Sequence, residues 1–249
     1  MGDSRFLFYA YFVAAFCAAK TFAGPPLITD DPDTPGPNHW ELNQAVTAEY
    51  INHEWQLQTP LSDDNYGVGN NIELTYEVSW NENVPDDSGA ESGLGDSLLG
   101  VKWRFLDQDK DWLDVSSYPQ VQFNNPTSSV RRGIVADGTS VIIPFEIGHR
   151  TGPLDIYTEP GYTWNQRDPA QGFVGIAAEY DLTEKFTIMG ELHYDFVNGF
   201  AQNELLFNIG FQQTLTKHMN LLGSAGRAIF GPPAIAPGFM SYLALQFLF

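Results

Sequence analysis

The segment 239–249, FMSYLALQFLF, ends the chain and carries the strongest fold signal in it. Leu243, Leu245, Phe247 and Phe249 occupy alternate positions, so they share one face if the segment is a strand. An exposed apolar edge strand invites association with other chains, so soluble domains rarely end on one. This ending favours a closed barrel whose outer face meets lipid, because closure leaves no edge.

The same alternation recurs from residue 40 onward. In 186–197, FTIMGELHYDFV, large apolar residues alternate with Glu191, His193 and Asp195. Residues 72–80 and 204–215 show the same period of two. No stretch sustains the three-and-four spacing of an amphipathic helix. The sequence therefore predicts an all-β chain.

Alternation alone fits both a soluble sandwich and a transmembrane barrel, and the connections favour the barrel. About twelve strands are predicted, with longer connections at 81–95, 125–138 and 166–171 alternating with shorter ones. Short periplasmic turns and longer outer loops produce this parity, as does an even number of strands. The predicted strands are 41–50, 55–66, 72–80, 96–106, 113–124, 139–148, 153–165, 172–180, 186–197, 204–215, 219–229 and 239–249. The predicted fold is a closed antiparallel transmembrane β-barrel of about 12 strands over residues 40–249.

Composition excludes several other classes. The 249 residues carry a formal net charge of −19, which argues against nucleic acid as a partner, because phosphate contacts need clustered Lys and Arg. Hydrophobic residues make up 43% of the chain, which excludes a disordered acidic protein. No uninterrupted apolar run reaches the roughly 18 residues of a membrane-spanning helix.

The N-terminus predicts export. Residues 1–23 combine Arg5 with an apolar stretch and small residues before a cut after Ala23, as in a cleaved signal peptide. Cys17 lies inside this stretch, so the exported chain has no cysteine and no disulfide. Residues 24–39, GPPLITDDPDTPGPNH, predict an extended arm rich in proline and aspartate. The expected location is the bacterial outer membrane.

Four motifs resemble those of a known Gram-negative outer-membrane family, "putative MetA-pathway of phenol degradation". They are ITDDPDTPGPNHWELN at 28–43, QTPLSDDNYGVGNNIELTYEV at 58–78, GLGDSLLGVKWRF at 93–105 and YDLTEKFTIMGEL at 180–192. The resemblance implies a twelve-stranded outer-membrane barrel that moves small hydrophobic or aromatic compounds. It supplies no catalytic or ligand residues. The terminal strand also resembles the signal that such barrels present to their assembly machinery, through Leu243, Leu245, Phe247 and Phe249.

Polar side chains at alternate positions predict the lumen wall and a possible substrate path. They are Glu73, Glu77, Lys102, Arg104, Asp155, Tyr157, Glu159, Glu191, His193 and Asp195. Glu73 and Glu77 are expected to pair with Lys102 and Arg104 on the next strand. Mutual neutralisation of charge competes with a ligand site as the reason for these pairs.

The row Glu191, His193 and Asp195 fits a hydrogen-bonded lumen histidine, a proton relay, a cation site or part of a hydrolase. As a metal site it is weak, because strand spacing separates the ligands and no further ligand is evident. No GxSxG elbow is present, so neither an enzyme nor a catalytic residue is predicted, and no metal or cofactor. An outer-membrane lipid hydrolase is the remaining enzymatic alternative.

The predicted function is a channel or transporter for small solutes, selected by lumen width and by an acidic wall that disfavours anions. Inward glycines at Gly100, Gly148, Gly161, Gly175 and Gly210 predict free space along the wall. A barrel of this size can also be filled by side chains or by the arm. A closed structural or interaction barrel is therefore the rival prediction. Expected partners are outer-membrane lipid, lipopolysaccharide, the barrel assembly machinery and an unidentified small solute.

Overall fold

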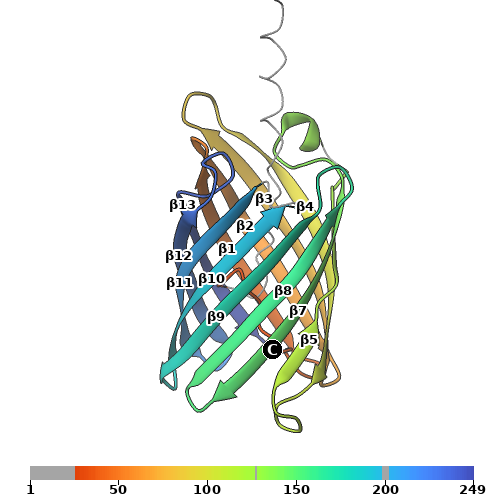
Figure 1. Ribbon diagram of the computed structural model, residues 1–249, viewed down its shortest axis with the longest axis vertical. Coiled ribbons are helices and arrows are strands. Elements are labelled where there is room, and N and C mark those ends of the chain that lie inside the picture. The colour runs from red at the N-terminus through yellow and green to blue at the C-terminus, as the bar shows by residue number, and fades with distance from the viewer. Residues whose placement is uncertain (1–25, 127, 198–201) are drawn as a thin grey trace, which may run out of the picture.

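The computed structural model describes residues 26–126, 128–197 and 202–249, and these form one closed antiparallel barrel around a lumen (Figure 1). The predicted signal peptide lies outside the described residues. The strands are β1 (Trp40–Ile51), β2 (Glu54–Val68), β3 (Ile72–Pro85), β4 (Glu91–Leu106), β5 (Asp114–Ser117), β6 (Gln120–Phe123), β7 (Thr139–Thr151), β8 (Leu154–Asn165), β9 (Gln171–Thr183), β10 (Phe186–Val197), β11 (Asn203–Thr216), β12 (Met219–Phe230) and β13 (Phe239–Leu248).

The barrel has twelve strand positions, because β5 and β6 are two halves of one strand. Both halves pair with β4 on one side and with β7 on the other. The barrel closes where β1 pairs antiparallel with β13, with Ala45 opposite Ala244. The Phe249 backbone N–H donates to the Trp40 carbonyl at 3.0 Å and completes the seam between the termini. The predicted closed twelve-stranded barrel is confirmed.

The connections differ in length at the two ends of the barrel. β1 begins and β13 ends at the lower end in Figure 1, where the strands are joined by short turns and by the residues between β4 and β5; we call this the turn end. The opposite, loop end carries the longest connection, 124–138, with the short helix Val130–Arg132. The expected loop 81–95 is shorter than predicted. β3 and β4 continue as a paired hairpin and leave only residues 86–90 between them.

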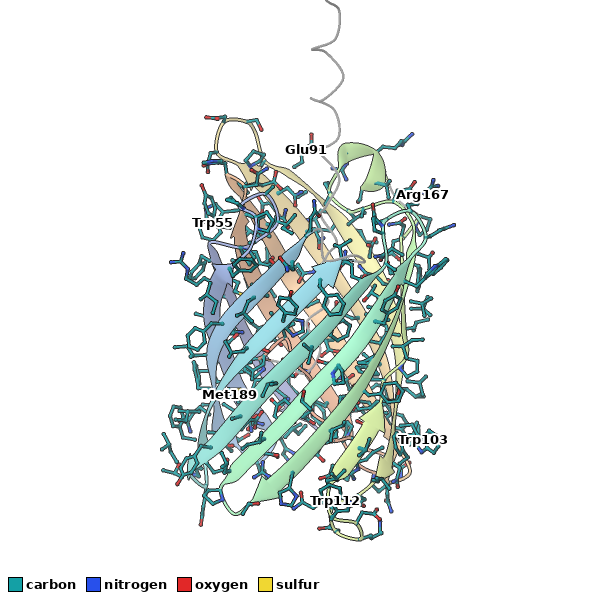
Figure 2. The ribbon with its side chains drawn as sticks, viewed as in Figure 1. Trp55, Glu91, Trp103, Trp112, Arg167 and Met189 are labelled. Atoms are coloured by element: carbon teal, nitrogen blue, oxygen red, sulfur yellow. The ribbon has the colours of Figure 1, made fainter. Side chains whose placement is uncertain are left out.

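The outer face of the barrel is apolar, as lipid contact requires. Exposed side chains on it include Leu99, Ile143, Ile176, Leu192, Ile209 and Leu243. Aromatic residues lie toward both ends, with Trp55 at the loop end and Trp103 and Trp112 at the turn end (Figure 2). Amphipathic aromatic rings stabilise a barrel at the two membrane–water boundaries. Within the described ranges, no helix has the length and apolarity needed to cross a bilayer.

Three prolines interrupt the hydrogen bonding of neighbouring strand positions, and we call this region the proline seam. Pro119 separates β5 from β6, Pro144 lies in β7, and Pro160 lies in β8. Between β7 and β8, the pairing passes from Pro144–Gly161 directly to Ile147–Thr158. Proline has no backbone N–H, so it cannot donate to the ladder of a sheet. The proline seam is therefore a part of the described wall with interrupted pairing.

Candidate functional site: a lumen filled by the N-terminal arm

The arm (residues 24–39, described from Pro26) enters the barrel, and residues 26–32 are largely buried against the inner wall. Leu27 and Ile28 are buried, with exposed fractions of 0% and 5%. Leu27 packs against Tyr157 and Met189, and Ile28 belongs to a separate apolar cluster in the lumen. Proline and aspartate give the arm no secondary structure, so its peptide groups need partners from the wall.

Wall carboxylates accept hydrogen bonds from the backbone of the arm. Glu191 accepts from the Ile28 N–H at 2.8 Å through Oε1 and from the Thr29 N–H at 2.7 Å through Oε2. Glu159 accepts from the Asp30 N–H at 2.8 Å. Each carboxylate thereby satisfies buried donors that have no strand partner, which is a strong reason for the arm to stay seated.

Wall cations bind the carboxylates of the arm. The Lys102 ammonium lies 2.8 Å from Asp30 Oδ2 and donates to the Asp31 carbonyl at 2.9 Å. Arg104 lies 2.7 Å from Asp33 Oδ1 and 3.8 Å from Asp114. Lys102 and Asp30 are almost fully buried, so this ion pair is screened little by water.

The expected pairing within the wall is therefore wrong in its details. Glu73 lies directly opposite Lys102 in the β3–β4 register, but Glu77 lies opposite Leu98 rather than Arg104. The close ion-pair partners of both cations come from outside β3, chiefly from the arm. The aspartates of the arm reach the cations because the arm runs through the middle of the lumen.

The inward glycines do not leave free space, contrary to the sequence-based prediction. A side chain at Gly175 would collide with Thr29, and one at Gly148 would lie 2.9 Å from Pro32 Cγ. Other inward glycines are covered by side chains of the wall. Phe173 covers Gly161, Tyr118 covers Gly100, and Met189 lies against Gly210. These glycines allow close packing of the arm and of aromatic rings.

The seated arm borders two chambers in the lumen. The turn-end chamber is lined by Asp30, Asp33, Glu41, Asp63, Glu73, Glu77, Lys102, Glu179 and other polar residues. The loop-end chamber is lined by Ile28, Gln120, Gln122, Ile142, Thr163, Asn165, Gln171, Phe173, His193 and Asp195, among others. Gln120 lines both chambers, and the arm supplies Ile28 to one and Asp30 to the other.

The remaining candidate residues are distributed along the inner wall. His193 is buried, with its Nδ1 3.4 Å from Thr29 Oγ1 and its Nε2 3.5 Å from Asp195 Oδ2. Tyr157 donates to Glu179 Oε1 at 2.9 Å. Asp155 accepts from Arg150 Nε at 3.2 Å. The row Glu191–His193–Asp195 thus faces the arm and the loop-end chamber. Among the predicted alternatives, this arrangement supports a hydrogen-bonded histidine in the lumen.

Sequence reasoning missed the partners that the arm brings into the lumen. Thr29, Asp30 and Asp31 contact predicted wall residues, although none of the three was a candidate. The missed signal is the match between three aspartates in the arm segment 24–39 and two inward cations. In the part of the chain that the structure describes, no group of three or more His, Cys, Asp or Glu residues has a metal-binding arrangement.

Comparison with known families places this geometry in context. Residues 26–233 match the model of the family described as "Putative MetA-pathway of phenol degradation". The chain belongs to this family. The match begins within the arm and covers residues of β1 to β12. No curated protein matches the chain by sequence.

Solved structures with the same fold are outer-membrane proteins. One is the COG4313 outer membrane channel from Pseudomonas putida F1, with a TM-score of 0.65, 11% identity, and coverage of 86% of this chain and 96% of that one. The NanC porin has a TM-score of 0.61, 11% identity, and coverage of 83% and 98%. The KdgM porin has a TM-score of 0.55, 11% identity, and the same coverage. These likenesses support the outer-membrane type of barrel predicted from the sequence.

Proposed function

We propose that this protein is an outer-membrane conduit for small solutes, exported after removal of residues 1–23, in which the arm occludes the resting path. The observation that supports this most directly is the arm itself. Its backbone donors bond to Glu159 and Glu191, and its Asp30 pairs with Lys102. Because these partners lie on different strands, a solute must pass beside the arm or displace it. No enzymatic activity is proposed.

The charge of the lumen supports a preference for cationic or neutral solutes. Carboxylates outnumber cations around the turn-end chamber, where Lys102 is the only basic residue in the lining. A ring of one charge sign attracts counter-ions and disfavours ions of the same sign. An anionic solute therefore meets an unfavourable potential in this chamber.

Conductance in a planar bilayer tests the conduit. We take the turn end as the periplasmic end of the barrel. The full chain is expected to give small, cation-selective conductance steps. Deletion of residues 24–39 should give larger steps, because the space held by Leu27–Asp33 becomes open. If neither folded protein conducts ions, the open-path proposal is wrong, and the closed structural barrel replaces it.

The proline seam supports a second candidate, lateral transfer of apolar solutes from the lumen into the bilayer. Barrel walls resist opening because every backbone group is paired. Pro119, Pro144 and Pro160 reduce that pairing on three neighbouring strand positions. The Pro144 carbonyl accepts instead from the Tyr118 N–H at 3.3 Å and from the Ser117 hydroxyl at 2.9 Å. Opening the wall at the seam therefore costs fewer backbone hydrogen bonds than opening an unbroken strand pair.

A disulfide across the proline seam tests lateral transfer. Ile147 and Thr158 are opposite residues beside the unpaired stretch, and both lie on the outer face. In the Ile147→Cys/Thr158→Cys variant, oxidation should abolish transfer of an apolar fluorescent probe into the bilayer and leave ion conductance unchanged. The matched control is Ile188→Cys/Phe211→Cys in the regular β10–β11 pair. Equal transfer by the oxidised and reduced seam variant would exclude this route.

A further inference from the structure

Four carboxylates in the wall of the turn-end chamber have no cation beside them. Among the described residues, no Lys, Arg or His nitrogen lies within 4.0 Å of any of the four. Lys102, the one basic side chain in the lining, pairs instead with Asp30 of the arm. Negative charge is therefore in excess in this chamber while the arm is seated. The four residues come from the neighbouring strands β1, β2 and β3, and they are Glu41, Asp63, Glu73 and Glu77.

Hydrogen-bond donors are also too few for two of these carboxylates. The Thr75 hydroxyl lies 3.2 Å from Glu73 Oε1, but its single proton has a closer acceptor in Asn65 Oδ1, at 2.6 Å. No other described residue bonds to the Glu77 side chain. Glu73 is only 7% exposed, so bulk water has little access to it. A carboxylate in this state costs free energy unless a cation or a donor reaches it.

A buried amide in the same chamber lacks a partner as well. Gln120 is 3% exposed and lines the chamber, and its side chain bonds to no other described residue. It lies at the level of Thr75 along the barrel, because Gly100 pairs with both residues. The amide oxygen is a hydrogen-bond acceptor, as the carboxylates are. A neutral amide adds no charge, so this second observation independently points to a ligand that donates hydrogen bonds.

The spacing of the carboxylates indicates an extended ligand. Asp63 and Glu77 lie directly opposite each other, whereas Glu73 is four residues from Glu77, about 13 Å along the same strand. One metal ion cannot bridge that distance, and in the described part of the chain no acidic or histidine cluster has a metal-binding arrangement. Leu98, opposite Glu77 in β4, and Met189 add buried apolar surface to the lining. Several cationic groups joined by methylene groups match this pattern.

We propose that the turn-end chamber binds a linear aliphatic polyamine. This inference rests on the proposed conduit, because it names a class of solute that the acidic lumen admits. One terminal ammonium group lies between Asp63 and Glu77, and the other lies at Glu73. Gln120 accepts a hydrogen bond from an internal amine, since its level falls between those of Glu73 and Glu77. The N–H groups of the polyamine supply the donors that the wall lacks.

Equilibrium binding to the full protein in a non-ionic detergent tests the site without requiring passage. The probes, compared at neutral pH and constant ionic strength, are spermidine, putrescine, butylamine, 1,4-butanediol and Mg²⁺. We expect affinity to fall from spermidine to putrescine to butylamine, with little binding of the diol. Mg²⁺ has the same charge as putrescine and should bind more weakly. Absence of spermidine binding, or binding of Mg²⁺ as tight as that of putrescine, overturns the proposal.

A matched pair of charge-removing variants locates the terminal ammonium group. Glu77→Gln removes a carboxylate that accepts no hydrogen bond from other described residues, and we expect spermidine affinity to fall about tenfold. The control Asp64→Asn removes the same charge from a nearby residue of β2 that does not line the chamber, and affinity should not change. Heat-modifiable migration in gels verifies that both barrels fold. Equal effects of the two variants would mean that only overall charge matters, which contradicts the site.

The variant Gln120→Leu tests the internal amine. It removes the buried amide and no charge, so it should weaken spermidine binding severalfold while putrescine, which has no internal amine, keeps its affinity. A preference for spermidine over putrescine that survives this substitution would contradict the placement of the polyamine. The conduit is tested separately by conductance. Polyamine binding to a protein that conducts no ions would contradict only the conduit, whereas conductance without polyamine binding would contradict only this site.

Discussion

Replacing Gly175 with leucine is expected to unseat the arm and open the lumen. Gly175 lies in β9 against Thr29, and a Cβ built at this position lies 2.8 Å from the Thr29 Cβ and still closer to its hydroxyl. The arm must therefore move when a side chain is added. Overpacking of this kind costs about 1–3 kcal/mol, which lowers the ratio of seated to displaced arm by about fivefold to a hundredfold. Single-channel recording should show a matching rise in open time.

Two further variants make this prediction specific. Gly190→Leu adds the same side chain on the outer face of β10, where the nearest atoms lie 3.5 Å or more from a built Cβ. It should leave the open time unchanged. Glu191→Gln weakens the acceptor of the Ile28 and Thr29 N–H groups and should raise the open time without added bulk. An unchanged open time in both Gly175→Leu and Glu191→Gln would mean that the arm does not occlude the path.

The barrel itself was predictable from sequence because its signals are local. Period-two alternation in segments such as 186–197, together with the terminal Phe249, depends only on neighbouring residues and on the lipid environment. The exact strand ends were less predictable. β3 and β4 continue through the predicted loop 81–95, because a hairpin outside the membrane no longer needs strict alternation of apolar residues.

The interior was less predictable because it depends on contacts between distant segments. Glu191 and Ile28 are 163 positions apart, and no periodicity relates an arm without secondary structure to the wall. The candidates Glu159, Glu191 and His193 were placed on the inner face by alternation, but their partners in the arm were not foreseen. Gly148 and Gly175 were expected to leave space, because the sequence does not show that Pro32 and Thr29 of the arm lie against them. A glycine's missing side chain does not reveal what fills the volume.

Loss of the Lys102 ammonium is expected to be the most destabilising single change in the lumen. Lys102 is 3% exposed, pairs with Asp30 at 2.8 Å, and lies opposite Glu73 in the neighbouring strand. Glu146, which is fully buried and bonded to Ser116, lies nearby in β7. Lys102→Met leaves these carboxylates without their cation. Breaking one partner of a buried ion pair costs about 3–5 kcal/mol, which urea unfolding in lipid vesicles should detect.

The double variant Asp30→Asn/Lys102→Met separates loss of the ion pair from loss of packing. If the cost comes from an uncompensated Asp30 carboxylate, removing that charge as well should restore a large part of the free energy of unfolding. Asp30→Asn alone should cost less than Lys102→Met, because the lysine retains the Asp31 carbonyl and the neighbouring Glu73. Additive effects of the two substitutions would show that the arm and the wall are not coupled through this pair. If the interaction free energy between the two substitutions is comparable to the cost of the single variant, the Lys102–Asp30 contact is the main electrostatic attachment of the arm. Lys102→Met is then also expected to raise conductance.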